Sequence, residues 1–269
     1  MRVKCPAKIN TFLAVGPPDV TGYHPLRTIF QAIDLCDELE IEPADVTTIS
    51  CDWDALPADN TLSKALRLFS EIANVPPLAI HLTKRIPAES GLGGGSSDAA
   101  GLLRALELLC PGTPHDHVEM IAASVGADVP FFLVGGRARA EGYGEKLTAL
   151  PDLPVETVLI ARPPTGAATA GAYAALDKIE RPFAEWPACD SETYNDFERV
   201  ACAESLQLIS LLRSAGASRA GLSGSGSAVF GFFDNDADTA QIAAQLPSGT
   251  QTWVTRTLSR KECLWISSS

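Results

Sequence analysis

Apolar residues follow two spacings along this chain, and together they predict a mixture of strands and helices. Apolar and polar side chains alternate between residues 3 and 15, which predicts a strand. From 60 to 73 the apolar residues recur every three or four positions, which predicts an amphipathic helix. By the same criteria strands are expected at 29–41 (one or two strands), 47–51, 78–82, 129–134, 138–140, 155–161, 219–222, 229–233 and 252–258, and helices at 98–109, 117–125, 169–176, 196–214 and 236–246.

The order of these elements predicts a two-layer α+β protein with two lobes. The segment Pro151-Asp-Leu-Pro154 interrupts the pattern just before the strand expected at 155–161. We therefore place the domain boundary at this segment. The N-terminal lobe is expected at residues 1–150 and the C-terminal lobe at residues 151–269.

Composition and charge narrow the class of protein. The chain has 269 residues, of which 46% are hydrophobic and 20% are charged, as is ordinary for a globular protein. No apolar run approaches the ~20 residues that span a bilayer, and the first residues lack the apolar core of a secretory signal. We therefore expect a cytoplasmic protein with no membrane partner. The net charge of −12 disfavours nucleic acid as a partner, and the seven scattered cysteines argue against a disulfide framework or a zinc site.

The strongest chemical signal is the segment 87–100, which reads PAESGLGGGSSDAA. Its glycines at 91, 93, 94 and 95 let the backbone turn and approach a ligand closely. An alanine- and leucine-rich run follows, so we expect the loop to lead into a helix with Ser96 or Ser97 as its N-cap. The N–H groups at such a helix start bind anions, phosphate above all. The segment matches neither a Walker A motif nor G-x-G-x-x-G, so spacing alone leaves a phosphate cradle and a tight strand-to-helix turn both open.

Together with other segments, this loop resembles the phosphate-binding motif of the GHMP kinases. The other segments, in the family's order, are Pro6-Ala-Lys-Ile-Asn10, Gly22-Tyr-His24, Gly126-Ala-Asp-Val-Pro130, Asn195-Asp-Phe-Glu198 and Gly221-Leu-Ser-Gly-Ser-Gly226. The resemblance implies a two-lobed GHMP kinase fold, with an N-terminal lobe like ribosomal protein S5 domain 2 and a ferredoxin-like C-terminal lobe. It places the active site between the lobes and implies ATP and Mg²⁺ as cofactors.

The resemblance assigns the chemistry to residues far apart in the sequence. Asp128 falls on the family's catalytic aspartate, and we expect it, just before the strand predicted at 129–134, to act as general base toward the acceptor hydroxyl. Lys8 matches the lysine beside that aspartate, where it would keep the carboxylate ionised and stabilise charge on the transferred phosphoryl group. Asn10 faces the same side of its strand as Lys8 and is expected to bind the acceptor polyol.

The ATP-binding residues are expected on the glycine loop and at one helix start. The resemblance puts Asn60 near the adenine pocket, while the residues alone predict a helix N-cap there. Backbone N–H groups of the loop would bind the phosphates in place of a Walker lysine. The loop residues assigned to ATP are Pro87, Ala88, Glu89, Ser90, Gly91, Leu92, Gly93, Gly94, Gly95, Ser96 and Ser97.

The segment Gly22-Tyr-His24 resembles one branch of the family, whose small-molecule acceptor is a cytidyl diphosphate polyol. The resemblance implies that Tyr23 stacks on the cytosine ring and that His24 binds the edge of the base. Thr169 and Tyr173 lie one helical turn apart and face the same side, and Tyr173 is expected to cover the other face of the cytosine. Ser96 or Ser97 could touch Mg²⁺, but no metal ligand is assigned, and we expect a monomer or a weak homodimer.

Three alternatives stay open. Another small-molecule GHMP kinase, of the homoserine or mevalonate type, would share the loop but would not depend on cytosine. A non-catalytic nucleotide-binding protein would keep the scaffold without the chemistry, and a ribosomal-type RNA binder is disfavoured by the acidic charge. Two segments depart from the family's pattern. Pro17–Thr21 lacks the usual basic lead into Gly22-Tyr-His24, and the carboxylate of Glu89 opposes the charge of ATP unless it points away or pairs with Lys84 or Arg85.

Overall fold

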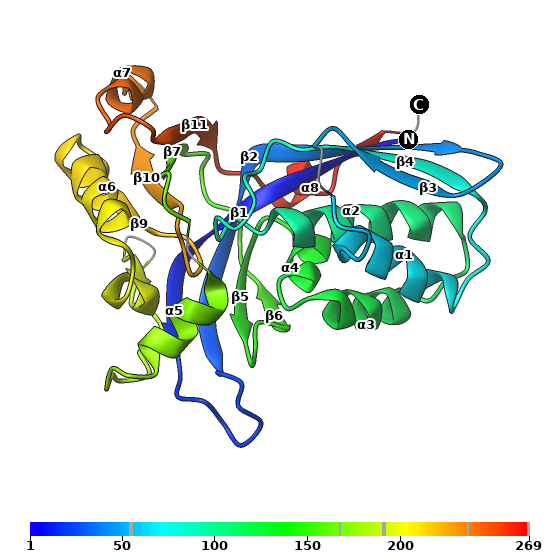
Figure 1. The fold of residues 1–269 in the computed structure, drawn as a ribbon, viewed down its shortest axis with the longest axis horizontal. Helices are drawn as coiled ribbons and strands as arrows, with labels where there is room; N and C mark the ends of the chain where they lie inside the picture. The colour runs from blue at the N-terminus through cyan, green and yellow to red at the C-terminus, as the bar shows by residue number, and fades with distance from the viewer. Residues whose placement is uncertain (54–55, 167, 190–191, 236, 268–269) are drawn as a thin grey trace.

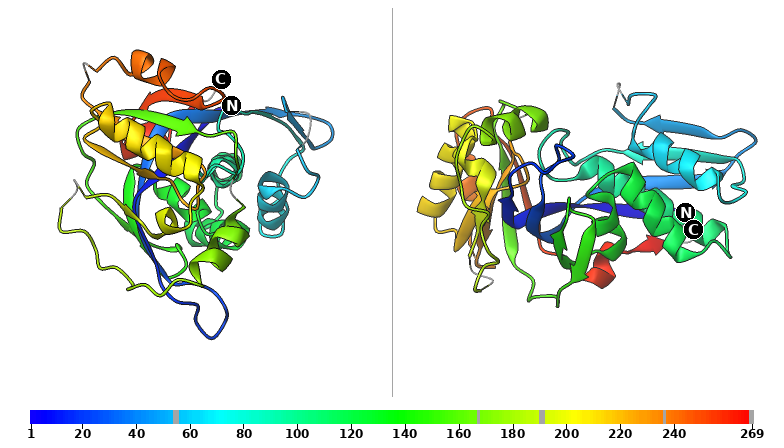
Figure 2. Two further views of the ribbon diagram at one scale, coloured as in Figure 1. Left: turned by 60° about the vertical axis from the view of Figure 1, so that its left-hand side comes forward. Right: turned by 90° about the horizontal axis from the view of Figure 1, so that it is seen from below.

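Two sheets organise the part of the chain that the structure describes. The structure is a computed structural model and describes residues 1–53, 56–166, 168–189, 192–235 and 237–267. The larger sheet has the strand order β12-β1-β2-β4-β3, with β5 paired to β2, β6 to β5 and β8 to β1. The smaller sheet has the order β11-β7-β10-β9. Figures 1 and 2 show the smaller sheet and its helices at one end of the molecule and the larger sheet with its helices at the other.

A long antiparallel hairpin forms the spine of the larger sheet. β1 (Arg2–Val15) pairs with β2 (Leu26–Pro43) along nearly its whole length. Most β1 residues are buried, because helices cover one face of the hairpin and the smaller sheet packs against part of the other. The apolar segment 29–41 thus lies within one strand.

The remaining elements of the N-terminal part complete this sheet and cover one of its faces with helices (Figure 1). The strands are β3 (Thr48–Cys51), β4 (Leu78–Thr83), β5 (Arg137–Glu141) and β6 (Lys146–Ala149). The helices are α1 (Thr61–Ser70), α2 (Gly94–Leu109), α3 (His115–Val125) and α4 (Val129–Val134). Helix α2 contacts β1, β2 and each of the other three helices, so it forms the centre of this core.

The strand predicted at 129–134 is wrong, because these residues form the helix α4. A six-residue apolar run fits a buried strand and a buried helix equally well by periodicity. Here Pro130 lies in the first helical turn, where its missing N–H costs nothing, and Gly135 ends the helix with φ +67°. Phe131 is fully buried and its ring lies 4.8 Å from that of Phe30. Packing between α2, α3 and the sheet therefore decides the helical conformation.

The smaller sheet has the strand order of a ferredoxin-like fold. Its elements are β7 (Thr157–Arg162), α5 (Thr169–Leu176), α6 (Ala203–Ser214), β9 (Arg219–Leu222), β10 (Val229–Phe233), α7 (Thr239–Ala244) and β11 (Gln251–Arg256). All its strand pairs are antiparallel. One face packs against α6, while the other, through Val158, Ile160 and Phe230, packs against Ile9 and Ile33 of the hairpin. An apolar interface therefore joins the two sheets.

Two predicted helices are shorter than expected. The segment 196–214 forms a 3₁₀ turn, η1 (Asp196–Arg199), and then the separate helix α6. Side chains of η1 bind β1 and β9, and these contacts hold it apart from the helix that follows. In the segment 236–246, α7 begins only after Asp238, whose side chain caps it. Residue 236 lies outside the described part.

The end of the described chain returns to the larger sheet. The short helix α8 (Arg260–Cys263) precedes β12 (Ile266–Ser267), which pairs with β1, and the short strand β8 (Tyr194–Asn195) also pairs with β1. The buried Arg104 of α2 donates hydrogen bonds to the carbonyl oxygens of Lys4 and Cys263. Sequence reasoning predicted none of β6, β8, α8 and β12. The domain boundary near residue 150 stays a prediction.

Candidate active site

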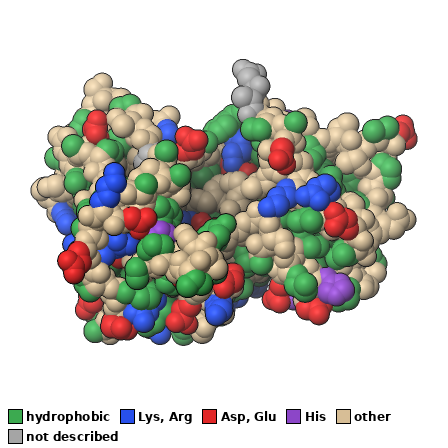
Figure 3. Space-filling model, turned by 60° about the horizontal axis from the view of Figure 1, so that its bottom comes forward, with side chains coloured by type: hydrophobic (Ala, Val, Ile, Leu, Met, Phe, Trp, Pro, Cys, Tyr) green, Lys and Arg blue, Asp and Glu red, His purple; other side chains and the backbone are tan. Residues whose placement is uncertain are grey.

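Two cavities meet at the glycine loop. The larger, of about 500 Å³, is lined by residues of the loop and of the segments around β3 and α1. The smaller, of about 210 Å³, is lined by residues of β1, β2, α5 and the loop that follows β9. Gly91 and Gly93 line both. Figure 3 shows the surface hollowed between the two ends of the molecule.

The glycine loop is pressed against the loop 221–226 of the C-terminal part. Gly91 has φ +78°, and a Cβ there would lie 2.0 Å from the carbonyl oxygen of Ser223. The Ser223 hydroxyl donates to the Gly91 carbonyl oxygen over 3.0 Å, and the N–H of Ala228 donates to the Ser90 carbonyl oxygen. These contacts require glycine at position 91 and fix the loop where the two cavities join.

Helix α2 begins one turn earlier than predicted. Its N-cap is Gly93, at φ +76°, and the N–H of Ser97 donates to the Gly93 carbonyl oxygen. Ser96 and Ser97 therefore lie inside the first turn, so the prediction of a serine N-cap is wrong. The first turn, 94–97, contains only glycine and serine, and the N–H groups at the start of a helix suit an anion.

Leu92 and Ser97 differ from the other loop residues assigned to ATP. Both are fully buried, and neither lines the larger cavity, whereas every other assigned loop residue does. The Ser97 hydroxyl has no hydrogen-bond partner among the described residues.

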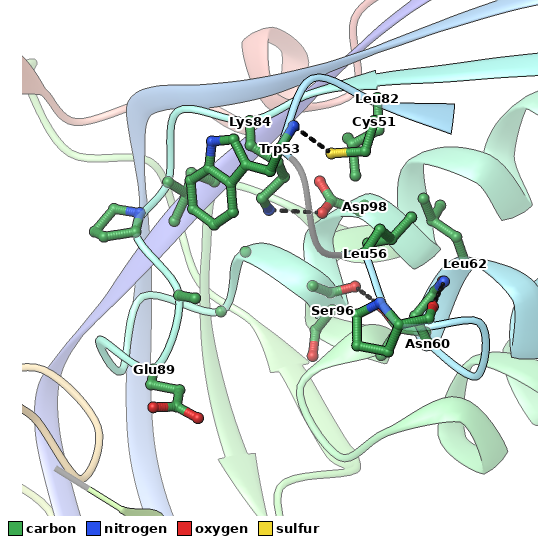
Figure 4. Close-up of a pocket in the computed structure, with 18 of the residues that line it drawn as sticks. Cys51, Trp53, Leu56, Asn60, Leu62, Leu82, Lys84, Glu89, Ser96 and Asp98 are labelled. Carbon is green, nitrogen blue, oxygen red and sulfur yellow. Dashed lines mark hydrogen bonds and ion pairs between the residues drawn. The ribbon is translucent and has the colours of Figure 1, made fainter. Parts of the chain in front are cut away.

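Apolar side chains at one end of the larger cavity form a pocket suited to a flat ring. They belong to Trp53, Leu56, Leu62 and Leu82 (Figure 4). Asn60 also lines this cavity, but its side chain accepts from the N–H of Ser63 and donates to the Pro57 carbonyl oxygen, as an N-cap does. Sequence reasoning missed Trp53. The only signal for it was an aromatic residue shortly before a predicted helix.

Lys84 precedes the glycine loop and does not neutralise Glu89, because its ammonium binds the carboxylates of Asp37 and Asp98. Figure 4 shows the Glu89 carboxylate turned away from Lys84. Glu89 itself lines the larger cavity, so its carboxylate stays beside that cavity without pairing with Lys84.

Lys8 and Asp128 meet in the smaller cavity. Lys8 Nζ lies 3.4 Å from Asp128 Oδ2, 2.7 Å from Asn10 Oδ1 and 2.8 Å from the Gly91 carbonyl oxygen. The Lys8 side chain is 4% exposed and that of Asp128 is 33% exposed. Asp128 occupies the N-cap position of α4, but its side chain makes no capping hydrogen bond to the described residues. Its carboxylate is therefore available to the cavity.

Asn10 links the strand β1 to the loop 221–226. Its Oδ1 accepts from Lys8 and from the N–H of Gly224 over 2.9 Å, and its Nδ2 donates to Thr28. The segment Asn195–Glu198 fixes the same loop. Asn195 Nδ2 donates to the carbonyl oxygens of Leu222 and Gly224, each over 2.8 Å. Sequence reasoning expected this segment only to help shape the cleft and did not name these partners, because they lie almost 30 residues further along the chain.

Tyr173, His24 and Phe197 form a row of rings beside Asp128. The ring centroids of His24 and Tyr173 are 4.9 Å apart, as are those of Tyr173 and Phe197. Burial, with a smaller effect of the Asp128 charge, raises the pKa of Tyr173 to about 12, so its hydroxyl stays neutral. Thr169 lines the same cavity and lies 3.0 Å from the hydroxyl of Ser225.

Tyr23 lies apart from this row. It is 67% exposed and its ring lies 5.6 Å from that of Tyr143, between β5 and β6. The Tyr143 hydroxyl donates to Asp19, in the same hairpin loop as Tyr23. The structure therefore packs His24, but not Tyr23, against Tyr173, which lines the cavity that holds Lys8 and Asp128.

The paired lobes, the glycine loop and the Lys8–Asp128 pair define a small-molecule kinase of the GHMP class. The family model for the GHMP kinases N terminal domain matches residues 60–136, and that for the GHMP kinases C terminal domain matches residues 192–249. The chain belongs to the GHMP kinase family, in the group formed by the 4-diphosphocytidyl-2-C-methyl-D-erythritol kinases.

Relatives and solved structures agree on this group. The 4-diphosphocytidyl-2-C-methyl-D-erythritol kinase of Solibacter usitatus is 37% identical, covering 96% of this chain and 90% of its own. The same kinase of Geobacter sulfurreducens is 38% identical, and the match covers 91% of this chain and 94% of that protein. A crystal structure of 4-(cytidine 5'-diphospho)-2C-methyl-D-erythritol kinase has a TM-score of 0.83, with 32% identity over 96% of this chain and 99% of its own. The mevalonate kinase of Methanococcus jannaschii shares the fold, with a TM-score of 0.71. It is 16% identical, and the match covers 96% of this chain and 98% of that one.

Proposed function

We propose that this enzyme transfers the γ-phosphoryl group of ATP to the 2-hydroxyl of 4-diphosphocytidyl-2-C-methyl-D-erythritol, in the non-mevalonate isoprenoid pathway. The observation that carries the proposal is the Lys8–Asp128 pair, which lies in the smaller cavity beside the glycines shared with the larger one. A phosphoryl group held by the glycine loop and a hydroxyl held in the smaller cavity would meet at this pair. The names of the relatives supply the acceptor.

ATP binds in the larger cavity in this proposal. The apolar pocket around Trp53 and Leu82 receives the adenine ring, and the N–H groups at the start of α2 receive the phosphates. Thr61, whose hydroxyl donates to the Gly95 carbonyl oxygen, ties the adenine side of the cavity to the phosphate loop. The triphosphate then extends past Gly91 and Gly93 toward Lys8.

Mg²⁺ is a prediction that rests on the family alone. The described residues hold no group of three or more His, Cys, Asp or Glu side chains placed to bind a metal ion. Asp128, which lines the smaller cavity, and Asp98, which lines the larger one, each pair with a lysine. The residues present do not form a metal site, and no step below is assigned to one. We expect Mg²⁺ to arrive on the phosphates of ATP.

The transfer step uses the two ends of the Lys8–Asp128 pair differently. The acceptor oxygen forms a bond to the γ-phosphorus while the bond from that phosphorus to the β,γ-bridging oxygen breaks, and ADP leaves with the bond's electrons. The hydroxyl proton passes to the Asp128 carboxylate. The Lys8 ammonium, held by Asn10 and Gly91, faces the phosphoryl oxygens and stabilises their charge.

The acceptor's cytidyl group lies along the row of rings in this proposal. Tyr173 offers a ring face in the cavity, and His24 lies beside it with Nδ1 2.9 Å from the Gly16 carbonyl oxygen. Tyr23 reaches the other face of the base only if the hairpin loop 16–24 moves from its contact with Tyr143.

Cytoplasmic location, absence of a nucleic-acid partner and a monomer or weak homodimer stay predictions. No helix in the described ranges is long and apolar enough to cross a bilayer.

A coupled ADP-release assay across acceptors tests the proposal. We expect turnover with the cytidyl diphosphate polyol and none above background with mevalonate or homoserine at equal concentration. Turnover with mevalonate or homoserine but not with the cytidyl compound would move the enzyme to another branch of the family. ADP binding without turnover of any acceptor would favour the non-catalytic alternative.

A further inference from the structure

A buried cluster of two carboxylates and one ammonium lies under the nucleotide cavity. Lys84 follows β4, Asp37 lies on β2 and Asp98 lies in α2, and Lys84 Nζ binds both carboxylates, Asp98 Oδ2 over 2.8 Å. Asp37 also accepts from the backbone N–H groups of Arg85 and Ile86. Because Lys84 and Asp98 flank the glycine loop in sequence, their ion pair closes the loop at its base (Figure 4).

The charges of this cluster do not balance if both carboxylates are ionised. Two carboxylates and one ammonium leave one net negative charge beside a cavity that receives the phosphates of ATP. The side chains of Asp37 and Asp98 are 0% and 3% exposed, so water does not screen that charge. A buried unbalanced carboxylate is costly in itself, and it also repels the nucleotide.

The two carboxylates bind the same ammonium. Lys84 Nζ binds Asp37 Oδ2 and Asp98 Oδ2, while Asp98 Oδ1 is buried and has no donor among the described residues. Two ionised carboxylates cannot form a hydrogen bond, because each only accepts. A proton on one of them would remove the repulsion between them and allow an O–H···O bond.

We infer that Asp98 works in its neutral, protonated form, donating a hydrogen bond to Asp37, so that the Asp37–Lys84–Asp98 cluster brings no net charge to the nucleotide cavity. Asp98 is thus a positioning residue, which holds the Lys84 ammonium and the base of the phosphate loop. The inference rests on the proposed binding of ATP in this cavity. Burial and then the charge of Asp37 raise the pKa of Asp98 to about 8, in keeping with a proton held at neutral pH.

The groups around Asp98 do not supply another charge that titrates near neutrality. Burial opposes the charge of Lys84, but Asp98 and Asp37 raise its pKa above the ordinary value, so it stays an ammonium. Burial raises the pKa of the thiols of Cys5, Cys36 and Cys51, so they stay neutral. The titratable and charged groups around the cluster are Cys5 on β1, Cys36 on β2, Cys51 on β3, Asp52 directly after β3 and Arg104 on α2.

ADP binding to the full chain, measured by calorimetry between pH 7 and pH 9.5, tests this inference. For the parent protein, ionisation of Asp98 near pH 8 weakens ADP binding by up to about tenfold between pH 7 and pH 9. Asp98→Asn mimics the protonated acid in shape and charge, so it should bind ADP as the parent does at pH 7 and lose this alkaline weakening. Asp98→Ala removes one of the two carboxylate partners of Lys84 and should weaken ADP binding about tenfold at every pH.

The controls separate charge from folding and from the proposed function. Asp116→Asn removes an exposed carboxylate from α3 and should leave the parent's pH profile unchanged. If Asp98→Ala does not fold, the profile of Asp98→Asn decides alone. The inference is overturned by a flat parent profile, by an Asp98→Asn variant that keeps the alkaline weakening, or by one that binds as poorly as the alanine variant at pH 7. A parent that binds no ADP at pH 7 overturns the proposed nucleotide site itself.

Discussion

The ammonium of Lys8 lies 3.4 Å from the carboxylate of Asp128, although the two residues come from a central strand and from the start of a helix far along the chain. Lys8 is nearly buried and is also bound to the Gly91 carbonyl oxygen, so the pair is tied directly to the phosphate loop. Asp128 keeps one side open to the cavity. The pair therefore has one fixed member and one accessible member, as a base acting on a bound hydroxyl requires.

Asp128→Asn should lower kcat by about 10²- to 10⁴-fold, because an amide cannot take the hydroxyl proton in the transfer step. Binding of ADP should change little, since Asp128 does not line the larger cavity. Steady-state ADP release and calorimetry with ADP measure the two quantities. A variant with full kcat would rule out Asp128 as the base.

Gly91→Ala should destabilise the protein and weaken ATP binding. An alanine at φ +78° costs about 1–2 kcal/mol of strain, and its Cβ would also lie 2.0 Å from the Ser223 carbonyl oxygen, which forces the two loops apart. Gly216→Ala is the matched control, because φ is +97° there and no described atom lies within 4 Å of the added Cβ. Urea unfolding and KM for ATP should show a larger loss for Gly91→Ala. Equal losses would mean that strain alone, and not the contact between loops, makes glycine necessary.

Tyr23→Ala should raise KM for the cytidyl acceptor about tenfold and leave KM for ATP unchanged, because stacking on a base is worth about 1–3 kcal/mol. Tyr143→Phe is a useful companion, since it keeps the ring that packs on Tyr23 and removes the hydrogen bond to Asp19. Its KM for the acceptor should stay near that of the parent. An unchanged KM in Tyr23→Ala would remove the stacking role and leave Tyr173 and His24 as the aromatic contacts of the base.

Asp98→Asn should become more stable relative to the parent as the pH rises. Burial and Asp37 raise the pKa of folded Asp98 from 3.8 to about 8, so the folded parent holds a proton that the unfolded chain releases between these values. The stability contributed by that proton is complete below about pH 4 and is lost as the pH rises through 8. Asparagine has no such loss. The difference in free energy of unfolding between variant and parent, measured in urea at pH 5 and pH 9, should therefore shift toward the variant, and a constant difference would contradict the raised pKa.

Local patterns in the sequence were enough for much of the fold. Apolar runs predicted β1, β4, β7 and β10, and apolar spacing predicted α1 and α3, because these apolar residues are buried in the fold. The glycine loop and the other GHMP kinase segments predicted the family, and the family models and relatives confirm it. These features depend on residues that are close together in the chain, which is why a linear pattern carries them.

Contacts between distant segments needed the tertiary structure. The six residues of α4 matched a strand until packing between α2, α3 and Phe30 made them a helix. Position 93 became the N-cap of α2 because only glycine takes its left-handed backbone easily, while the sequence favoured a serine side chain. Three further contacts join segments that are distant in the sequence. Asn195 binds the loop 221–226, and Tyr23 packs against Tyr143. The Asp37–Lys84–Asp98 cluster joins β2, the end of β4 and α2. The sequence determined which residue types are present and where elements form, whereas burial and charge balance, which exist only after folding, decided what those residues do.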